Sequence, residues 1–150
     1  KLLDTLLGSG MSSLLFEDMR DHRSLGYQTG SSFPSRTQGS HFAVYLGGDA
    51  ESNGKTFRSV FEGISKNLAE NGPSKQQFRE AQEQLKGNFL LDHETPGQRA
   101  WYRGFYEILG RTAEFDRHFT HEVESVNQEH IQKLASAIFV KNEPLFLTVS

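Results

Sequence analysis

The sequence predicts an α+β domain in which helices pack on one face of a mainly antiparallel sheet. Three observations support this class. Apolar residues recur at helical spacing through most of the 150 residues. Two runs of alternating apolar residues lie early in the chain, separated by a turn-forming segment. A third strand-like run closes the chain, so strands and helices are segregated along the sequence.

The first helical region starts at the first residues of the chain. Leucines with helical spacing fill residues 2–7, and no Ser, Thr, Asp or Asn precedes them to cap the first turn. Gly8-Ser9-Gly10 interrupts this helix, which resumes at Met11. The uncapped start predicts that further residues lie upstream of Lys1. The apolar face of the resumed helix consists of Leu14, Leu15 and Met19.

A β-hairpin is expected next. The segment 34–40 is rich in Pro, Ser and Gly, which favours a turn or short loop between the two alternating runs. The first run carries Leu25, Tyr27, Thr29 and Phe33 on alternate positions, and the second carries Phe42, Val44 and Leu46.

Clear start and stop signals delimit the helices that follow. Apolar spacing over 57–68 predicts a helix that ends at Asn71-Gly72-Pro73. Ser74 and Gln77 form a capping-box pattern, and Thr95 and Gln98 repeat it with a Pro at the first helical position. The apolar faces of these two helices are expected to be Phe78, Ala81, Leu85 and Phe89 in the first, and Trp101, Phe105, Ile108 and Leu109 in the second.

The last third of the chain predicts two helices and a strand. A short helix is expected around 115–123, and Asn127 caps another. The run Leu145–Val149 is expected to be a strand. Three strands are few for this amount of helix, so residues 1–150 are expected to form a single incomplete domain whose other strands lie upstream of Lys1. The inward face of the last helix is expected to be Ile131, Leu134, Ala135, Ile138 and Phe139.

Composition excludes several classes of function. Lys and Arg total 16 against 19 Asp and Glu, a net charge of −3, which argues against nucleic-acid binding. No run approaches the ~20 consecutive apolar residues that cross a bilayer, so no membrane span is expected. The chain has no Cys, which excludes disulfides, thiol nucleophiles and Cys-ligated metal sites, but its six His leave metal chemistry open.

No metal site or nucleophile motif is complete in this sequence. The zinc-peptidase patterns HExxH and HxxEH are both absent. His118 and His121 lie on one predicted helix, but two ligands make no site, so a polar helix face is the favoured interpretation. The other isolated histidines, His22, His41 and His130, are expected on the surface or in loops.

One cluster of charged and aromatic residues joins a helix end to the first strand, over residues 18–27. Gly26 permits a bend, so Arg23 and Tyr27 could converge on one oxygen and hold a peptide carbonyl or stabilise an oxyanion. The alternative is that Arg23 pairs with Glu17 or Asp18 while Tyr27 keeps its hydroxyl in water. Spacing alone favours this alternative.

Three segments resemble the pitrilysin/insulinase family of zinc metallopeptidases. Residues 7–27, which read LGSGMSSLLFEDMRDHRSLGY, are similar to the family's GGGMSSRLFQELREKRGLAYSV region. Residues 72–87 resemble its GPTEEELERAKEQLKG helix, and residues 126–135 resemble the helix before its terminal strand. The matches cover nearly the whole chain in the family's order. Ser9 and Leu14 depart from it, because the family often has Gly and Arg there.

The resemblance implies a fold like that of mitochondrial processing peptidase and LuxS, and a place among the inverzincins. Family members pair two homologous halves, fused or as separate subunits, and one half carries HxxEH and zinc. Lacking HxxEH, this chain resembles the C-terminal non-catalytic half, which holds no cofactor and helps close a chamber around a peptide. In that half an R-x-x-x-Y pattern contacts the substrate carbonyl, and Arg23 and Tyr27 fit it.

The resemblance leaves two functions open. In one, the chain is part of a zinc endopeptidase that cleaves peptides or small unfolded proteins, with zinc in an HxxEH-bearing half fused upstream or supplied as a separate subunit. In the other, it is an inactive scaffold or peptide-binding subunit, like the core proteins of respiratory complex III. A bacterial periplasmic or envelope location follows from the resemblance alone.

Overall fold

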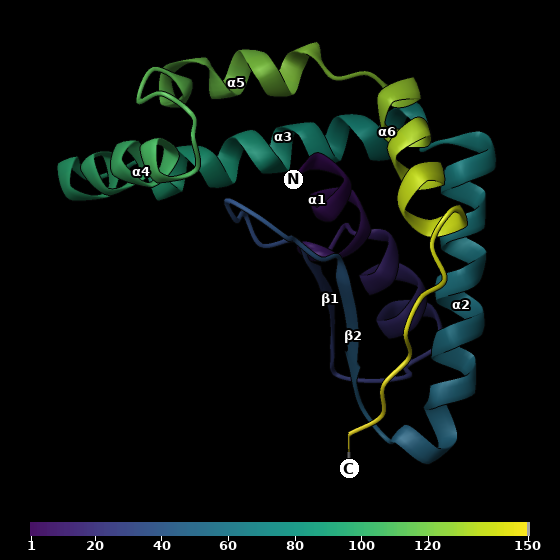
Figure 1. Cartoon of the computed structure of the whole chain (residues 1–150). Helices are drawn as coiled ribbons and strands as arrows, with labels where there is room; N and C mark the ends of the chain where they lie inside the picture. The colour runs from purple at the N-terminus through teal and green to yellow at the C-terminus, as the bar shows by residue number, and fades with distance from the viewer. Residues whose placement is uncertain (150) are drawn as a thin grey trace.

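Helices pack on one side of a short β-hairpin in the computed structural model, which describes residues 1–149 (Figure 1). The α+β class expected from the sequence is confirmed. In chain order the elements are α1 (Leu2–Gly8), the π-helical segment η1 (Phe16–His22), β1 (Gln28–Ser32), β2 (Ala43–Gly47), α2 (Ala50–Asn71), α3 (Lys75–Asp92), α4 (Pro96–Ile108), α5 (Phe115–Ser125), α6 (Gln128–Ala135) and the π-helical segment η2 (Ser136–Val140).

The predicted hairpin is confirmed. Strands β1 and β2 pair antiparallel, with Gln28 opposite Gly47 and Ser32 opposite Ala43. Helix α1 packs against β1, and it comes close because Gly8 lacks a side chain. A Cβ at Gly8 would lie 2.2 Å from the backbone nitrogen of Ser31. The backbone of α1 at Gly8 therefore lies in direct contact with the backbone of β1.

The core is built from residues of α1, α2, α3 and α6. The leucines of α1 are buried, and Leu7 and Leu15 are fully buried. Burying a leucine side chain contributes roughly 1.5–3 kcal/mol. Helix α1 contacts α3, α6 and β1, so this short helix joins the hairpin to the helical layer (Figure 1).

The predicted helix caps are all present. Gln77 donates its backbone N–H to Ser74 Oγ at 3.2 Å, and Gln98 donates to Thr95 Oγ1 at 3.2 Å. Asn127 caps α6 by accepting from the backbone N–H of His130. Gly72 ends α2 with a φ of +71°. These boundaries were predictable because capping depends on residues within one turn.

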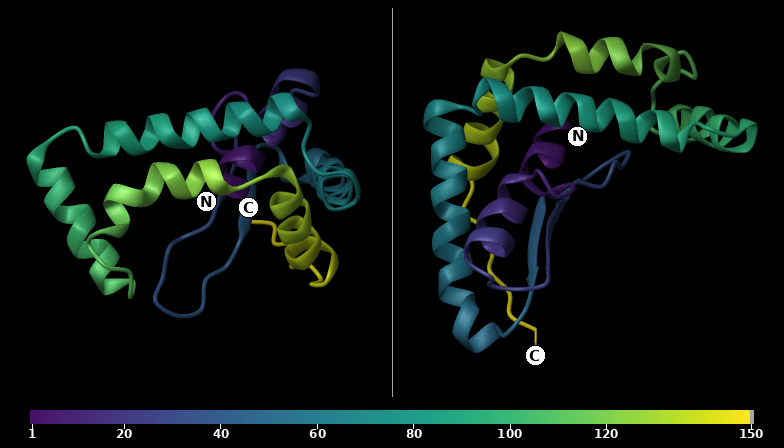
Figure 2. Two further views of the ribbon diagram at one scale, coloured as in Figure 1. Left: turned by 90° about the horizontal axis from the view of Figure 1, so that it is seen from above. Right: turned by 180° about the vertical axis from the view of Figure 1, so that it is seen from behind.

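An arm extends beyond the body of the domain (Figures 1 and 2). It consists of helices α4 and α5 and the C-terminal end of α3. The predicted inward face of α4 is wrong in part, because Trp101 is 60% exposed and Ile108 is 73% exposed. Tyr106 is buried instead, with its ring 5.0 Å from that of Phe115. Helix α4 packs on α5 and not on the main core, so the face of α4 that is buried differs from the predicted one. On α6, Leu134 is likewise exposed while Ile131 and Ala135 are buried.

The C-terminal run is extended but is not a strand, which corrects the expectation for Leu145–Val149. Phe146 packs against Phe61, and the Arg58 guanidinium lies 4.0 Å from the Phe146 ring centre. A strand requires a ladder of backbone hydrogen bonds to a neighbour. Within residues 1–149 the only paired strands are β1 and β2. Further strands upstream of Lys1 stay a prediction.

No helix in the described part of the chain is both long enough and apolar enough to span a lipid bilayer.

Candidate functional site

Tyr27 immediately precedes β1, at the open end of the hairpin. Its backbone N–H donates to the Gly47 carbonyl at 3.2 Å, which extends the ladder by one residue beyond β1. Its side chain is 80% exposed. The backbone of Tyr27 is therefore fixed by the hairpin while its ring is presented to solvent.

The turn before Tyr27, residues 23–26, reverses the chain between η1 and β1. Ser24 adopts a left-handed conformation with a φ of +52°, which is uncommon outside glycine. Leu25 donates its N–H to the Met19 carbonyl at 2.8 Å. A Cβ at Gly26 would lie 2.3 Å from the Gly47 carbonyl oxygen, so only glycine fits there. The reversal brings η1 alongside the start of β1.

Arg20 is the residue that the turn brings to Tyr27. Its guanidinium carbon lies 4.9 Å from the centre of the Tyr27 ring and 4.6 Å from the centre of the Phe16 ring. Both distances suit cation–π contacts. Phe16 and Arg20 are four residues apart on one helical segment, a spacing that the sequence could have revealed. The Arg20–Tyr27 contact depends on the left-handed Ser24, which no sequence pattern signalled.

Arg23 takes a different partner. Its Nε contacts a carboxylate oxygen of Asp18, one of the two acidic partners considered from the sequence. Both side chains are partly exposed. Asp18, which lies on η1, holds the Arg23 guanidinium. The expected contact of Arg23 with a substrate carbonyl stays a prediction.

The loop before η1 is fastened to α3. Gln84 donates from Nε2 to the Ser9 carbonyl at 2.6 Å, and Ser12 Oγ lies 3.4 Å from Gln84 Oε1. Gly10 completes the loop with a φ of +89°. The predicted break between helical pieces is therefore confirmed.

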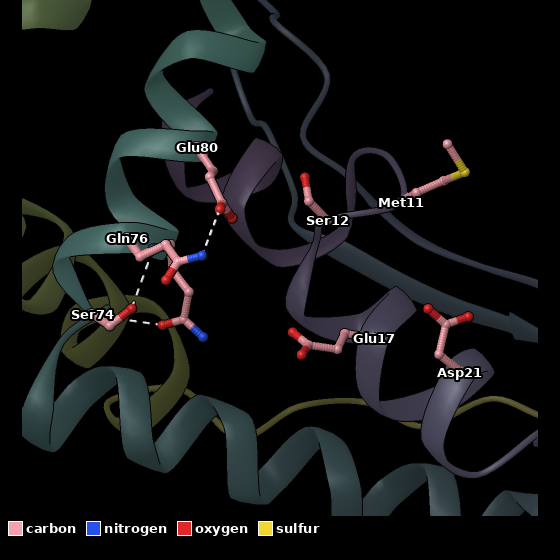
Figure 3. A pocket seen from close by; sticks show the side chains of 8 residues that line it. Met11, Ser12, Glu17, Asp21, Ser74, Gln76 and Glu80 are labelled. Atoms are coloured by element: carbon pink, nitrogen blue, oxygen red, sulfur yellow. Dashed lines mark hydrogen bonds between the residues drawn. The ribbon is translucent and has the colours of Figure 1, made fainter.

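A pocket of about 430 Å³ lies between this loop, η1 and the start of α3 (Figure 3). Its carboxylates are Glu17 and Asp21 from η1 and Glu80 from α3. The described residues that line it include no Lys, Arg or His. This negative lining favours cations over anions. The remaining lining residues are Met11, Ser12, Ser74, Gln76 and Gln77.

The histidines do not gather into a metal site. Among the side chains that the structure describes, no three His, Asp or Glu are placed to hold one metal ion. His118 and His121 are exposed on α5, and His22, His41 and His130 are exposed as expected. His93 is the exception, because it is buried in the arm against Asp116. Sequence reasoning missed this pair, because Asp116 belongs to a different helix and only tertiary packing brings the two together.

Comparison with known proteins gives a consistent result for both sequence and fold. The family described as "Peptidase M16 inactive domain" matches residues 1–85. The Bacillus subtilis protein named "Uncharacterized zinc protease YmxG" is 27% identical over 147 residues, which cover 97% of this chain and 36% of that protein. The chain thus spans about a third of the length of this relative.

Two solved structures resemble the fold at low sequence identity. A peptidase M16 inactive domain from Pseudomonas fluorescens superposes with a TM-score of 0.80 at 17% identity, over 92% of this chain and 33% of that one. A protease from Helicobacter pylori superposes with a TM-score of 0.72 at 18% identity, over 92% of this chain and 34% of that one.

Proposed function

The chain belongs to the peptidase M16 family, as an inactive domain of that family, and we propose that it forms the zinc-free half of a zinc-dependent endopeptidase. A second half that carries HxxEH would hold the zinc, either fused to this chain or as a separate subunit. Together the halves would close a chamber around a peptide or small unfolded protein. The name of the Bacillus subtilis relative supports this proposal at the level of the whole protein.

The residues that the structure describes do not fit a zinc site. Zinc in proteins takes three or four His, Cys, Asp or Glu ligands. The described part of the chain brings no such group together, and the sequence contains no Cys. We therefore assign the metal chemistry to the HxxEH half. The residues described above have another task, which is to bind and orient the peptide.

The observation that carries this proposal is the placement of the Arg20 guanidinium against the Tyr27 and Phe16 rings. Aromatic rings hold the guanidinium by its faces and leave its N–H donors free at the edge. In the described part of the chain, no side chain is hydrogen-bonded to the Tyr27 hydroxyl. Arg20 and Tyr27 thus offer two kinds of donor from one exposed surface, suited to a single carbonyl oxygen.

We extend the predicted Arg23 and Tyr27 pair to include Arg20. Asp18 neutralises much of the charge of Arg23, whereas the described contacts of Arg20 are with neutral rings. A guanidinium with no carboxylate in direct contact stabilises a nearby oxyanion more strongly than one already paired. Arg20 is therefore the stronger electrostatic donor of the two arginines, and Arg23 is the second candidate.

The experiment that tests this proposal compares the chain alone with the complete protein. The chain alone should hydrolyse no peptide and should bind less than one zinc per molecule after dialysis, measured by elemental analysis. Adding the HxxEH half should produce zinc-dependent peptide cleavage. One tightly held zinc on the chain alone would contradict the proposal. A complete protein that binds peptides without cleaving them would favour the scaffold or peptide-binding function.

A further inference from the structure

We propose that Asn53 of α2 is a positioning residue for the Arg20 and Tyr27 pair. Its side-chain amide donates a hydrogen bond from Nδ2 to the carbonyl oxygen of Leu25. Leu25 lies in the 23–26 turn, two residues before Tyr27. This inference rests on the proposed function, because the pair that Asn53 would position is the one to which we assign peptide binding.

The 23–26 turn is the hinge that sets the position of Arg20 relative to Tyr27. Arg20 contacts two rings, that of Phe16 in η1 and that of Tyr27, the residue before β1. The Tyr27 ring is mostly exposed, so little packing fixes its position. The geometry of the pair therefore follows from the backbone of the turn, which includes the left-handed Ser24.

Three elements converge on this turn. From η1, the Met19 carbonyl accepts the Leu25 N–H. From the end of β2, the backbone at Gly47 and Gly48 approaches so closely that a Cβ at Gly48 would lie 2.7 Å from the Leu25 carbonyl oxygen. From the first turns of α2, Asn53 supplies the donor that this oxygen accepts. Among the described residues, Asn53 is the one whose side chain hydrogen-bonds to the backbone of the turn.

Asn53 thereby ties the hinge to the longest helix of the domain. Helix α2 packs along α6 and η2 and contributes Val60, Phe61 and Leu68 to the core, so it is a rigid support. Without the Asn53 amide, the Leu25 carbonyl loses its side-chain donor, and the backbone of the turn is held only by other backbone groups. A strained turn held by fewer bonds samples more conformations, and a misplacement of about 1 Å can lower a rate by about 100-fold.

The test replaces Asn53 in the complete protein with its HxxEH half. Asn53→Leu keeps the side-chain size but has no donor, and Asn53→Asp keeps the shape but replaces the donor with an acceptor. Asn67→Leu is the matched control, because Asn67 is an exposed asparagine on the same helix. Arg20 side-chain resonances report the position of the pair, since two ring faces shift nearby proton signals upfield.

We expect both Asn53 variants to bring the Arg20 resonances toward those of a solvated arginine. We expect kcat to fall by at least about tenfold, with KM changed by less than about threefold, because misplaced donors weaken transition-state contacts most. Asn67→Leu should change neither quantity. Circular dichroism checks that all variants fold, and if one Asn53 variant does not fold, the other carries the test.

Two results would overturn the inference in distinguishable ways. Unchanged Arg20 resonances in both Asn53 variants would show that Asn53 does not position the pair, and would leave the proposed function standing. Shifted Arg20 resonances with unchanged kcat would show that the pair has no part in cleavage. In that case the proposed role of Arg20 and Tyr27 fails, and with it the inference that Asn53 positions them for cleavage.

Discussion

Nε2 of His93 lies 2.7 Å from a carboxylate oxygen of Asp116, and both side chains are buried in the arm. Nδ1 of His93 lies 2.6 Å from the Phe89 carbonyl, which only accepts, so Nδ1 carries a proton. Without a second proton, Nε2 and the Asp116 oxygen would be two buried acceptors facing each other. This buried pair joins the end of α3 to α5.

Asp116→Asn should destabilise the protein. The imidazole is stacked between the rings of Phe89 and Tyr102 and cannot reach water for a new partner. Loss of the carboxylate disrupts a buried polar contact, and leaving a buried polar group unsatisfied costs about 1–3 kcal/mol. Urea denaturation followed by circular dichroism measures the loss. Asp21→Asn, at an exposed position on η1, should change the free energy of unfolding by less than about 0.5 kcal/mol. Equal stability of the two variants would contradict the buried pair.

Alkaline pH should weaken the arm through Tyr106. Burial, followed by the negative charge of Asp116, raises the pKa of Tyr106 from 10.0 to about 12. A raised pKa means that folding favours the neutral phenol, so its contribution to stability is complete below pH 10 and is lost as the pH rises toward 12. Urea midpoints measured across this range should fall more steeply for the unmodified chain than for Tyr106→Phe. Parallel curves would contradict this account.

Gly8→Ala should destabilise the contact between α1 and β1. The added Cβ would meet the Ser31 backbone at 2.2 Å, and backbone cannot rotate away as a side chain can. Overpacking of this kind typically costs about 1–3 kcal/mol. Gly63→Ala on α2 is the control, because nothing lies within 4 Å of the new Cβ. Its higher helix propensity should stabilise by roughly 0.5–1 kcal/mol. If both variants change stability in the same direction, the close approach at Gly8 is wrong.

Local signals in the sequence predicted most helix boundaries correctly. The capping boxes at Ser74, Thr95 and Asn127 involve residues within one turn, so the pattern contains all the necessary information. The exposed Trp101 was not predictable in this way, because the orientation of α4 depends on its packing against α5. The prediction of a strand at 145–149 was wrong for a similar reason. A strand needs a neighbouring strand to pair with, and the local sequence does not show whether one is present.

In the candidate site, too, local contacts were predictable from the sequence and tertiary contacts were not. The sequence identified the 18–27 segment and the Arg23–Asp18 alternative, because residues close along a helix are neighbours. Arg20 was missed, because its contact with Tyr27 requires the left-handed Ser24 and the close approach of Gly26 to Gly47. A reversal of this kind places residues seven positions apart in contact, which neither helical nor strand spacing predicts.

The most direct test of the proposed function is the turnover of the complete protein after Tyr27→Phe. This change removes one hydroxyl from a mostly exposed ring and keeps the cation–π contact with Arg20. Tyr45→Phe, which removes a hydroxyl from an exposed tyrosine on β2, is the matched control. Loss of one oxyanion donor lowers kcat by about 100- to 1,000-fold in other hydrolases. We predict that Tyr27→Phe lowers kcat by more than about tenfold while Tyr45→Phe leaves it unchanged. Equal turnover in both variants would contradict the proposal that this surface contacts the substrate.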